Sequence, residues 1–536
     1  MKEPYPRHST TISLKYMTPI LTASQMRQAD HHAIHETGIP GLVLMENAAR
    51  GCFEVIYEFF EQDVANRTML VLCGGGNNGG DGLAIARHAA LHEMYSVCVL
   101  LVPREKLGDD AAAQLAMLTE FPEVEIVEGA EALHSISEYE FDLILDAMLG
   151  TGAHGAPRSP FAEAIELANG TYCPKIAVDI PTGVNSDTGE VAGTAFEADA
   201  TITMGALKPG LLLGEGPDYA GETFVAHIGA PPSLYDNAQC FLLDQETALP
   251  GVPEVLRNRH KYDRGKALVL AGSDGMTGAG LLASSAAIKS GAGLVVLGTP
   301  ESAAGHAVSR LPAEIMSLTL PSSDGAFGPG AFAALADVRD QYDVIALGPG
   351  ITQAEHAASL AKEIVRNAEQ TLVLDADGLN AFSGQGDELA EREAPLIITP
   401  HEGELKRLLG ISTNDPHSAY DPLAVARTAA VRCDCIVVLK GAPTMIAIPD
   451  GTVWINSHGN PGMATAGAGD VLTGILAGLL AGCSQEDILA GVLTGVYLHS
   501  LAADLAAEEL GVHSLTASDI IAFLPEAFAV LEGEWE

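Results

Sequence analysis

Residues 72–83 read LCGGGNNGGDGL, and this glycine-rich stretch decides the expected fold of the first half of the chain. It follows an apolar run of strand-forming residues at 68–73 and precedes 83–92, where apolar residues recur with helical spacing. Three of its glycines satisfy G-x-G-x-x-G, a pattern that lets the backbone approach a phosphate at a helix N-terminus. The stretch therefore predicts a strand–loop–helix unit with a phosphate-binding loop, although a plain tight turn would satisfy the same pattern.

The alternation of apolar strands with helical segments continues along the whole chain. Such strands are typical of parallel sheets that helices cover on both faces, so we expect an α/β protein with two three-layer α/β/α domains. The expected organisation is a disordered extension at 1–18, a first domain at 19–230, a linker at 231–258 that could contain one short strand at 240–243, and a second domain at 259–530. Strands are expected at 68–73, 95–102, 141–145, 175–180, 201–204 and 222–228, and then at 267–271, 294–297, 344–347, 371–374, 396–399 and 435–439.

The composition of the 536-residue chain limits the classes of function that remain. Hydrophobic residues make up 47% and charged residues 18%, which excludes a wholly disordered chain. The net charge of -42 opposes binding to nucleic acids and to anionic membranes. The N-terminus lacks the apolar segment of a signal peptide, and the longest apolar stretch, 471–483, is shorter than the ~20 residues that span a bilayer. We expect a cytoplasmic protein whose eight cysteines are reduced.

Two later loops of the first half fall at the carboxyl ends of expected strands, where open α/β sheets bind ligands. One loop is 146–155 and the other is 179–185. The amide of Asn78, the carboxylate of Asp146 and the hydroxyl of Thr182 could together surround a hard cation. One negative charge among neutral oxygens favours a monovalent ion such as K⁺. Each of these residues taken alone could equally be a cap or a turn residue.

A second glycine-rich loop, GNPGMATAGAGDVLTGI at 459–475, runs into a helix in the second half of the chain. The free amides of Ala468, Gly469 and Asp470 would form an anion site at the positive end of that helix. No GK[ST] follows, so the loop is not a Walker A motif. An acid beside phosphates suits a general base, which would take a proton from an attacking hydroxyl. The alternative for Asp470 is a helix N-cap.

Three other segments point to the same edge of the second domain. The segment 437–444 ends a strand with Lys440, which suits nucleotide phosphates, and 399–404 contains His401 with two acids. The segment 375–380 carries two acids and an amide. Carboxylates near phosphates usually indicate Mg²⁺, although a surface histidine and an ordinary turn explain the last two segments equally well.

Together the motifs resemble the bifunctional NAD(P)H-hydrate repair enzymes, in which an NAD(P)H-hydrate epimerase is fused to an ADP-dependent (S)-NAD(P)H-hydrate dehydratase. LTASQMRQAD, GGGNNGGDG, DAMLGTG and VDIPTGVNSDTG are similar to the epimerase, and HKYDRG, GAGLV, GPG, DADGLN, TPHEGE, VVLKGAPT and NPGMATAGAGDVLTGILAG to the dehydratase. The resemblance covers about 21–524. It implies a Rossmann-like first domain and a ribokinase-like second domain.

The resemblance also implies a role for particular residues. The epimerase substrate would be held by Asn77, Asn78, Gly79, Gly80, Asp81, Gly150, Thr151, Gly152, Ala153, His154, Gly155, Ala156 and Asp179, and K⁺ by Asn78, Asp146 and Thr182. The dehydratase substrate would contact Ala279, Gly350, His401 and Asp470, and the adenine nucleotide Lys440, Gly441, Ala442, Pro443, Thr444 and Gly469. Two segments depart from the family pattern, since 348–352 lacks a later glycine and 465–469 has alanines where glycine and serine are usual.

The activity that the resemblance implies is the repair of hydrated NADH and NADPH. The first domain would interconvert the R and S hydrates, with Asp179 handling the proton and Lys208 expected to be solvated. The second domain would phosphorylate the hydroxyl of the S hydrate with ADP or ATP and Mg²⁺, with Asp470 as the base, and phosphate would then leave. With ADP the products are NAD(P)H, AMP and phosphate. The family also implies a homo-oligomer.

Two other functions stay open at this point. A ribokinase-like small-molecule kinase fused to a nucleotide-binding module would explain the 459–475 loop, but not GGGNNGGDG or DAMLGTG. A non-catalytic interaction module, as in mRNA-decay scaffolds, would explain a domain similar to the first one. The 33 acidic and 12 basic side chains of residues 1–240 oppose contact with RNA.

Overall fold

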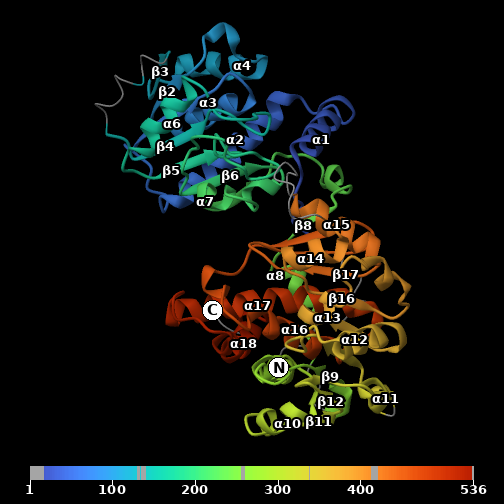
Figure 1. The fold of residues 1–536 in the computed structure, drawn as a ribbon. Helices are drawn as coiled ribbons and strands as arrows, with labels where there is room; N and C mark the ends of the chain where they lie inside the picture. Colours follow the sequence, from blue (N-terminus) through green and yellow to red (C-terminus); the bar gives the residue numbers. More distant parts are fainter. Residues whose placement is uncertain are drawn as a thin grey trace. The chain divides into compact units, whose positions relative to one another are not determined.

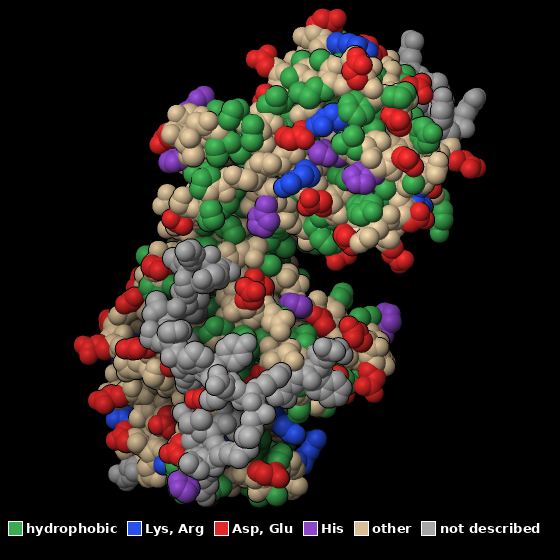
Figure 2. Space-filling view, turned by 180° about the vertical axis from the view of Figure 1, so that it is seen from behind, with side chains coloured by type: hydrophobic (Ala, Val, Ile, Leu, Met, Phe, Trp, Pro, Cys, Tyr) green, Lys and Arg blue, Asp and Glu red, His purple; other side chains and the backbone are tan. Residues whose placement is uncertain are grey.

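The computed structural model describes residues 17–129, 133, 140–254, 260–336, 338–411 and 421–533. Most of the expected extension at 1–18 therefore lies outside the described residues. Internal contacts divide the chain into two compact units, Thr18–Ala238 and Gln239–Glu536, which we call the first and the second domain (Figure 1). On the face drawn in Figure 2, acidic side chains are spread over both domains and basic ones are few, as the net charge of -42 requires.

The first domain contains a seven-stranded sheet in which every pairing is parallel. The strand order is β3-β2-β1-β4-β5-β6-β7, so the order reverses between β1 and β4, and Leu72 of β1 pairs with Asp146 of β4. The loops that follow these two strands diverge there, which opens a crevice at the carboxyl edge. The strands are β1 (Thr68–Cys73), β2 (Tyr95–Leu100), β3 (Val124–Glu128), β4 (Leu143–Ala147), β5 (Lys175–Val178), β6 (Ala200–Met204) and β7 (Glu222–Ala226).

Helices cover both faces of this sheet, as the alternation of side chains along β1 shows. Val71 and Cys73 belong to one apolar cluster with Phe53 and Leu83, whereas Leu72 belongs to a second cluster on the other face. This three-layer arrangement confirms the expected Rossmann-like architecture. The helices are α1 (Ala23–His35), α2 (Gly41–Phe59), α3 (Asn77–Ala90), α4 (Asp109–Met117), α6 (Phe161–Asn169) and α7 (Gly216–Ala220).

The second domain contains a ten-stranded sheet in the order β11-β10-β9-β14-β15-β16-β17-β18-β19-β8. Its strands are parallel from β11 to β17, and β18 is antiparallel to both of its neighbours. The order reverses between β9 and β14, which gives this sheet a crevice of its own. The strands are β8 (Cys240–Leu243), β9 (Lys266–Leu270), β10 (Leu294–Pro300), β11 (Met316–Leu320), β14 (Val344–Leu347), β15 (Thr371–Leu374), β16 (Leu396–Ile398), β17 (Ile436–Leu439), β18 (Thr444–Ala447) and β19 (Val453–Asn456), and a separate hairpin consists of β12 (Ser322–Ser323) and β13 (Ala326–Phe327).

In the segment expected as a linker at 231–258, the short strand at 240–243 is confirmed as β8, but it belongs to the sheet of the second domain. Residues of β8 pair with β19, with Cys240 opposite Val453, and α8 (Gln245–Ala248) packs on the long helix α17 (Ile488–Leu510). Cys240 and Leu243 are buried by these contacts. From residue 239 the segment is therefore part of the second domain, because its short apolar run completes the edge of the sheet.

Two helices of the second domain approach each other closely enough for their backbones to touch. They are α9 (Thr277–Lys289) and α16 (Ala468–Leu480). A Cβ on Gly474 would lie 2.1 Å from the Ala283 carbonyl oxygen, and one on Gly478 would lie 2.4 Å from that of Ala287. Only glycine fits at these two positions. The remaining helices are α10 (Glu301–Val308), α11 (Ala331–Ala336), α12 (Glu355–Asn367), α13 (Ala376–Asn380), α14 (Glu402–Leu409), α15 (Pro422–Cys433) and α18 (Ala517–Leu531).

Within the described ranges, one helix, Gln485–Leu510, is long and apolar enough to cross a membrane by length and composition alone. Most of its apolar window is buried inside the second domain, and core helices of this kind pass the same test. It is longer than the apolar stretch 471–483 that the sequence pointed to. All eight cysteines are free thiols, as expected.

Candidate functional sites

A cavity of about 490 Å³ opens at the carboxyl edge of the first sheet, where the strand order reverses. It is lined by α1, by the loops after β1, β4 and β5, and by the segment after β6. Four carboxyl groups, one lysine and one arginine give the cavity a strongly polar wall. These side chains are Asp30, Asp81, Asp110, Asp179, Lys208 and Arg27.

The glycines of residues 74–82 are required by close contacts beneath this cavity. A Cβ on Gly74 would lie 1.8 Å from the Met148 carbonyl oxygen, and one on Gly82 would lie 2.4 Å from the Ala147 Cβ. Side chains at these positions would push the loop after β1 away from the loop after β4. The glycine pattern therefore brings together the two loops that form the crevice.

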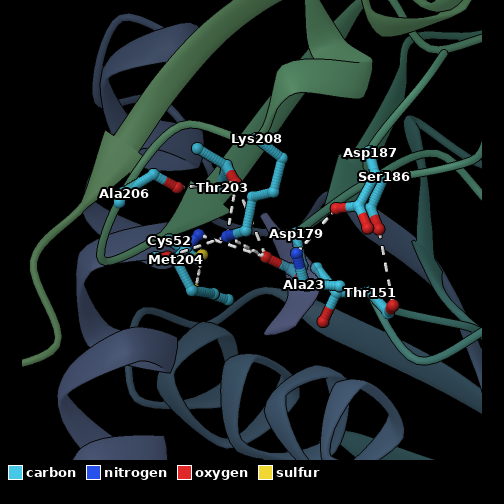
Figure 3. Close-up of polar contacts among 10 residues, drawn as sticks. All are labelled: Ala23, Cys52, Thr151, Asp179, Ser186, Asp187, Thr203, Met204, Ala206 and Lys208. Atoms are coloured by element: carbon cyan, nitrogen blue, oxygen red, sulfur yellow. Dashed lines mark hydrogen bonds and ion pairs between the residues drawn. The ribbon is translucent and has the colours of Figure 1, made fainter. Parts of the chain in front are cut away.

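Lys208 and Asp179 form a buried ion pair in the wall of the cavity (Figure 3). Lys208 Nζ lies 2.6 Å from Asp179 Oδ1, and it also donates to Thr203 Oγ1 and to the Met204 carbonyl oxygen, both at 2.8 Å. The Lys208 side chain is 1% exposed, so the expectation of a solvated lysine is wrong. A buried ammonium must have all of its hydrogens satisfied, and these three acceptors provide for that.

Asp179 has an unusual backbone conformation, with φ of 69°. A left-handed backbone is costly for a residue with a side chain, and it occurs most often at functional sites. The Asp179 amide donates to the Ile202 carbonyl oxygen at 2.8 Å, which fixes this turn at the carboxyl end of β5. The carboxylate is consequently held at the cavity wall in one orientation.

Asp146 and Thr182, two of the expected cation ligands, are in direct contact. Asp146 Oδ1 accepts from Thr182 Oγ1 at 2.8 Å, and Asp146 Oδ2 accepts from the Thr182 amide at 2.7 Å. Burial raises the pKa of Asp146 to about 6, although its hydrogen bonds with Thr182 and Met148 oppose the shift. The carboxylate thus has hydrogen-bond donors around it but lacks a positively charged neighbour among the described residues.

Asn78 is the third expected cation ligand. It is buried, and within the described part of the chain neither its amide oxygen nor its nitrogen has a hydrogen-bond partner. Gly150 connects it to the cavity wall, because a Cβ there would lie 3.5 Å from the Asn78 Cβ and 3.3 Å from Asp179 Oδ2. A buried amide without partners is costly unless a ligand satisfies it. The unsatisfied amide oxygen of Asn78 therefore suits an oxygen-binding cation such as K⁺.

The cavity contains most of the residues expected to hold the epimerase substrate. Gly79 and Gly80 are buried in α3 behind it, since their Cβ atoms would lie 2.0 Å from the Gly74 carbonyl oxygen and 2.7 Å from Met45 Cε. His154, Gly155 and Ala156 are exposed and are not among the described residues of its lining. The expected residues that do line it are Asn77, Asn78, Asp81, Gly150, Thr151, Gly152, Ala153 and Asp179.

In the second domain, Asp470 lies in the first turn of α16, which begins at Ala468. The preceding residue, Gly467, has φ of 93°, and a Cβ there would lie 2.5 Å from Leu282 Cδ1 of α9. The close packing of α9 on α16 therefore requires glycine at this helix start. Burial, followed by the charge of Asp375, raises the pKa of Asp470 to about 6, and Lys440 opposes this shift. Such a carboxyl can exchange a proton near neutral pH.

Lys440 lies beside the N-terminus of α16 and is fixed there by a buried carboxylate. Its Nζ is 2.6 Å from Asp375 Oδ1, and Thr473 Oγ1 donates to Asp375 Oδ2 at 2.8 Å. A Cβ on Gly469 would lie 3.4 Å from Lys440 Nζ, so the ammonium lies next to the first amides of the helix. Burial alone would lower the pKa of Lys440, but the neighbouring carboxylates outweigh it and raise the pKa. The arrangement combines a cation with free amides, which suits a phosphate.

The other expected dehydratase residues come together in part. His401 is the N-cap of α14, where its Nδ1 accepts from the Gly403 amide at 3.0 Å while the ring stays half exposed. Its backbone pairs with that of Lys440, which joins the two loops. Gly350 lies against Ala279, because a Cβ on Gly350 would be 3.1 Å from the Ala279 Cβ.

Asp377 and Asn380 have structural contacts instead of facing a metal. Asp377 accepts from the Thr352 amide at 3.1 Å, and Asn380 Nδ2 donates to Asp377 Oδ1 at 3.3 Å. Arg407 in turn donates to Asn380 Oδ1. No cluster of three or more His, Cys, Asp or Glu side chains that could hold a metal occurs in the described ranges. A Mg²⁺ ion would accordingly take most of its ligands from phosphates and water.

One buried residue near Asp470 was missed by the sequence reasoning. His499 of α17 donates from Nε2 to the Ala468 carbonyl oxygen at 3.0 Å, and burial lowers its pKa to about 4. It therefore supports the first turn of α16 as a neutral ring. No sequence signal was available, because His499 lies within a long apolar helix.

Comparison with known proteins supports the same two-part organisation. A family model described as NAD(P)H-hydrate dehydratase matches residues 267–526, and one described as YjeF-related protein N-terminus matches residues 41–210. The bifunctional NAD(P)H-hydrate repair enzyme Nnr of Moorella thermoacetica is 39% identical, with 96% of this chain and 98% of that protein covered. The protein of the same name from Salinibacter ruber is 38% identical, with 96% and 97% covered.

A solved structure of the ADP/ATP-dependent NAD(P)H-hydrate dehydratase from Bacillus subtilis, co-crystallised with ATP and Mg²⁺, is 35% identical. It covers 54% of this chain and 98% of that chain, with a TM-score of 0.47. The relatives from Moorella and Salinibacter extend over nearly the entire length of both proteins. The chain therefore belongs to the family of bifunctional NAD(P)H-hydrate repair enzymes.

Proposed function

We propose that the chain repairs hydrated nicotinamide cofactors at two separate sites, one in each domain. The first domain interconverts the R and S hydrates, and the second dehydrates the S hydrate with an adenine nucleotide as phosphoryl donor. The observation that carries the second assignment is Asp470 at the start of α16, beside Lys440. A base next to a phosphate-binding helix start is what phosphorylation of a hydroxyl requires.

In the dehydratase step Asp470 takes the proton of the C6 hydroxyl. The oxygen forms a bond to the terminal phosphoryl group of ADP, and the bond from that group to AMP breaks. The lone pair of the ring nitrogen then expels phosphate from C6, and loss of a proton from C5 restores the dihydropyridine ring. Free amides at the start of α16 stabilise charge on the transferred phosphoryl group, and one such contact typically supplies ~3 kcal/mol.

The nucleotide is proposed to lie along Lys440, Gly441, Ala442, Pro443, Thr444 and Gly469, with the hydrate near Ala279, Gly350 and His401. Support comes from the contacts of Lys440 with Asp375 and of Gly350 with Ala279. Mg²⁺, bound together with the nucleotide, would supply neutralisation of phosphate charge. We favour ADP as the donor.

In the first domain we propose that Asp179 handles a proton of the hydrate, and that Lys208 positions it. Lys208 has used its three hydrogens on Asp179, Thr203 and Met204, so it acts on the substrate only through Asp179. Asn78, Asp146 and Thr182 would hold K⁺, which would tie together the loops after β1, β4 and β5. The unpartnered amide of Asn78 is the main support for this cation site. A cytoplasmic location and a homo-oligomer remain predictions.

The test is to give the purified full chain hydrated NADH with ADP, Mg²⁺ and K⁺. We expect absorbance at ~340 nm to recover and phosphate to be released in equal amount. The S hydrate should react without delay, and the R hydrate only as fast as it is epimerised. A stable phosphorylated product would instead support a small-molecule kinase, and no recovery with either ADP or ATP would refute the proposal.

A further inference from the structure

The cavity of the first domain contains a carboxyl group that none of the expected site segments supplies. Asp30 lies on α1, outside residues 41–210, which the family model for this domain matches. The buried residues of α1 are Ala23, Met26, Ala29 and Ala33, and Asp30 lies next to this apolar stripe. It lines the cavity together with Asp81, Asp179 and Lys208. A carboxyl on the inner face of an amphipathic helix needs an explanation.

The segment that carries Asp30 is attached to the segment that carries Lys208. The Leu21 amide donates to the Leu207 carbonyl oxygen at 2.8 Å, and the Leu207 amide donates to that of Pro19 at 3.2 Å. At the start of α1, the Ala23 amide donates to Asp187 Oδ1 at 2.7 Å (Figure 3). These bonds fix α1 at the cavity independently of any contact made by Asp30 itself. Asp30 is therefore not needed to dock the helix.

The cavity is lined by four carboxyl groups and by two cationic side chains, Lys208 and the exposed Arg27. Lys208 is paired with Asp179. Neither Asp30 nor Asp81 has an ion pair or a side-chain hydrogen bond to any of the described residues. Burial raises the pKa of Asp30, Lys208 opposes this and Asp179 adds to it. The pKa of Asp81 is raised well above its usual value, mainly by burial. The charge of Asp30 also contributes to a raised pKa of Tyr235, after burial. The titratable and charged groups that interact with Asp30 or line the cavity with it are Lys208, Asp179, Asp81, Tyr235, Arg27 and Asp110.

We propose that Asp30 is a second catalytic residue of the epimerase site, which gives a proton to the departing hydroxyl on one face of the hydrated ring while Asp179 serves the other face. The inference rests on the proposed epimerase function and adds the identity of the proton donor. Two carboxyl groups in one cavity, one of them paired with a lysine and the other without an ion pair, are in environments that separate an acid from a base.

The step balances in atoms and charge. The Asp30 carboxyl protonates the C6 hydroxyl, the C6–O bond breaks with its electron pair, and water leaves. The lone pair of the ring nitrogen forms a double bond to C6, which leaves a positive charge next to the Asp179 carboxylate. A water molecule then adds to the opposite face of C6 and gives a proton to Asp179. Proton exchange with solvent restores both carboxyl groups.

Inversion at C6 explains why two groups from different elements are needed. The oxygen leaves from one face of the ring and returns on the other, and a single carboxylate on one strand loop reaches one face only. Asp81 and Asp110 also line the cavity, and Asp110 lies in the first turn of α4, beside Gly41. Asp81 is the closer alternative, because it interacts with Asp30 and Asp179. It is 8% exposed and lies in the second turn of α3, whereas Asp30 remains partly accessible from the cavity. We therefore assign the donor to Asp30.

The test compares Asp30→Asn with the unchanged full chain, using pure R hydrate and no nucleotide, so that the second domain stays idle. Conversion to the S hydrate is followed by chromatography above the buffer blank. We expect kcat to fall about 100-fold, the usual contribution of a general acid, with KM nearly unchanged. The rate of the unchanged enzyme should fall as pH rises through the pKa of the donor. Asp30→Asn should lack that descending limb, and Asp30→Glu should recover part of the rate.

The matched control is Glu36→Gln, the same loss of a carboxylate at the exposed end of α1. It should epimerise at the normal rate, and every variant should dehydrate S hydrate normally with ADP. If the unchanged chain does not epimerise, the proposed function fails. If it does and Asp30→Asn is equally fast, or only Asp81→Asn is slow, the assignment to Asp30 is wrong. A loss that appears in KM alone, with the pH profile unchanged, would also overturn it.

Discussion

Each domain has an Asp–Lys pair at the carboxyl edge of its sheet, and the two pairs have opposite exposure. In the first domain Lys208 is 1% exposed and Asp179 is 14% exposed. In the second, Asp375 is 1% exposed and Lys440 is 22% exposed. The distance between nitrogen and oxygen is 2.6 Å in both. The more exposed member of the pair is thus the carboxylate in the first domain and the lysine in the second.

The exposed member of each pair suits the chemistry proposed for its domain. A carboxylate backed by a buried lysine can exchange protons with a hydroxyl or stabilise a cationic ring. A lysine backed by a buried carboxylate presents a positive charge of fixed position, which suits a phosphate. In both domains the buried member is held by further bonds, Lys208 by Thr203 and Met204, and Asp375 by Thr473. The role of an Asp–Lys pair therefore depends on which of the two side chains is buried, and the residue types alone do not reveal that role.

The largest expected effect separates the two domains completely. Asp470→Asn removes the proposed base without changing its size, so dehydration of S hydrate should fall about a thousandfold. Binding of ADP and conversion of R to S hydrate should stay normal. The measurement is the initial rate of recovery at ~340 nm, with ADP affinity from calorimetry as the control. Normal turnover in this variant would show that Asp470 is not the base, and the proposed difference in chemistry between the two domains would lose its support.

The next prediction tests the reversed exposure directly with a matched pair of variants. Lys208→Met leaves Asp179 without its partner, and breaking a buried pair in this way typically costs about 3–5 kcal/mol. Lys440→Met leaves the carboxylate of Asp375, which is 1% exposed, without its partner, so we expect a larger loss of stability than for Lys208→Met and a higher KM for the nucleotide. Urea unfolding followed by circular dichroism and by tryptophan fluorescence distinguishes the domains, because the first domain contains no tryptophan and Trp454 is buried in the second. Equal destabilisation by the two variants would contradict the comparison.

Much of the fold was predictable because it depends on local sequence. The expected bounds of β1, β14 and β15 agree with the structure, since continuous apolar runs fill these buried strands. The half-exposed edge strands β3 and β11 were missed, because their side chains alternate with solvent and leave no apolar run. The glycine loops were found since close backbone contacts restrict those positions to glycine.

The buried polar partners could not be predicted, because they join segments that are distant in sequence. Thr473 bonds Asp375 across 98 residues, and Lys208 reaches Asp179 across 29. Lys208 was expected in solvent because the sequence LKPG by itself gives no sign that the lysine is buried. Asp30 did carry a signal, as a carboxylate next to the apolar stripe of α1, and periodicity within that helix would have revealed it.

A smaller effect is expected from the buried carboxylate behind Lys440. Asp375 raises the pKa of Asp470 and Lys440 lowers it, so Asp375→Asn should bring that pKa below its present value of about 6. The base acts when ionised, so dehydration rises with pH up to about 6 in the unchanged chain. In the variant the rise should come at lower pH, which a plot of log kcat against pH measures. A rise at the same or higher pH would contradict the proposed coupling.

The smallest effect concerns the cation site proposed for the first domain. Burial raises the pKa of Asp146 to about 6, above its value in the unfolded chain. Its negative charge therefore destabilises the first domain above pH 6, and this penalty disappears below about pH 4, where both states are protonated. K⁺ held by Asn78, Asp146 and Thr182 would relieve the penalty.

We expect K⁺ in place of Li⁺ to stabilise the first domain by about 1 kcal/mol at pH 7.5, at concentrations several times Kd, and by less at pH 4.5. Circular dichroism would show the shift, tryptophan fluorescence would not, and Asp146→Asn should abolish it. Equal stability in both salts at pH 7.5 would count against the site.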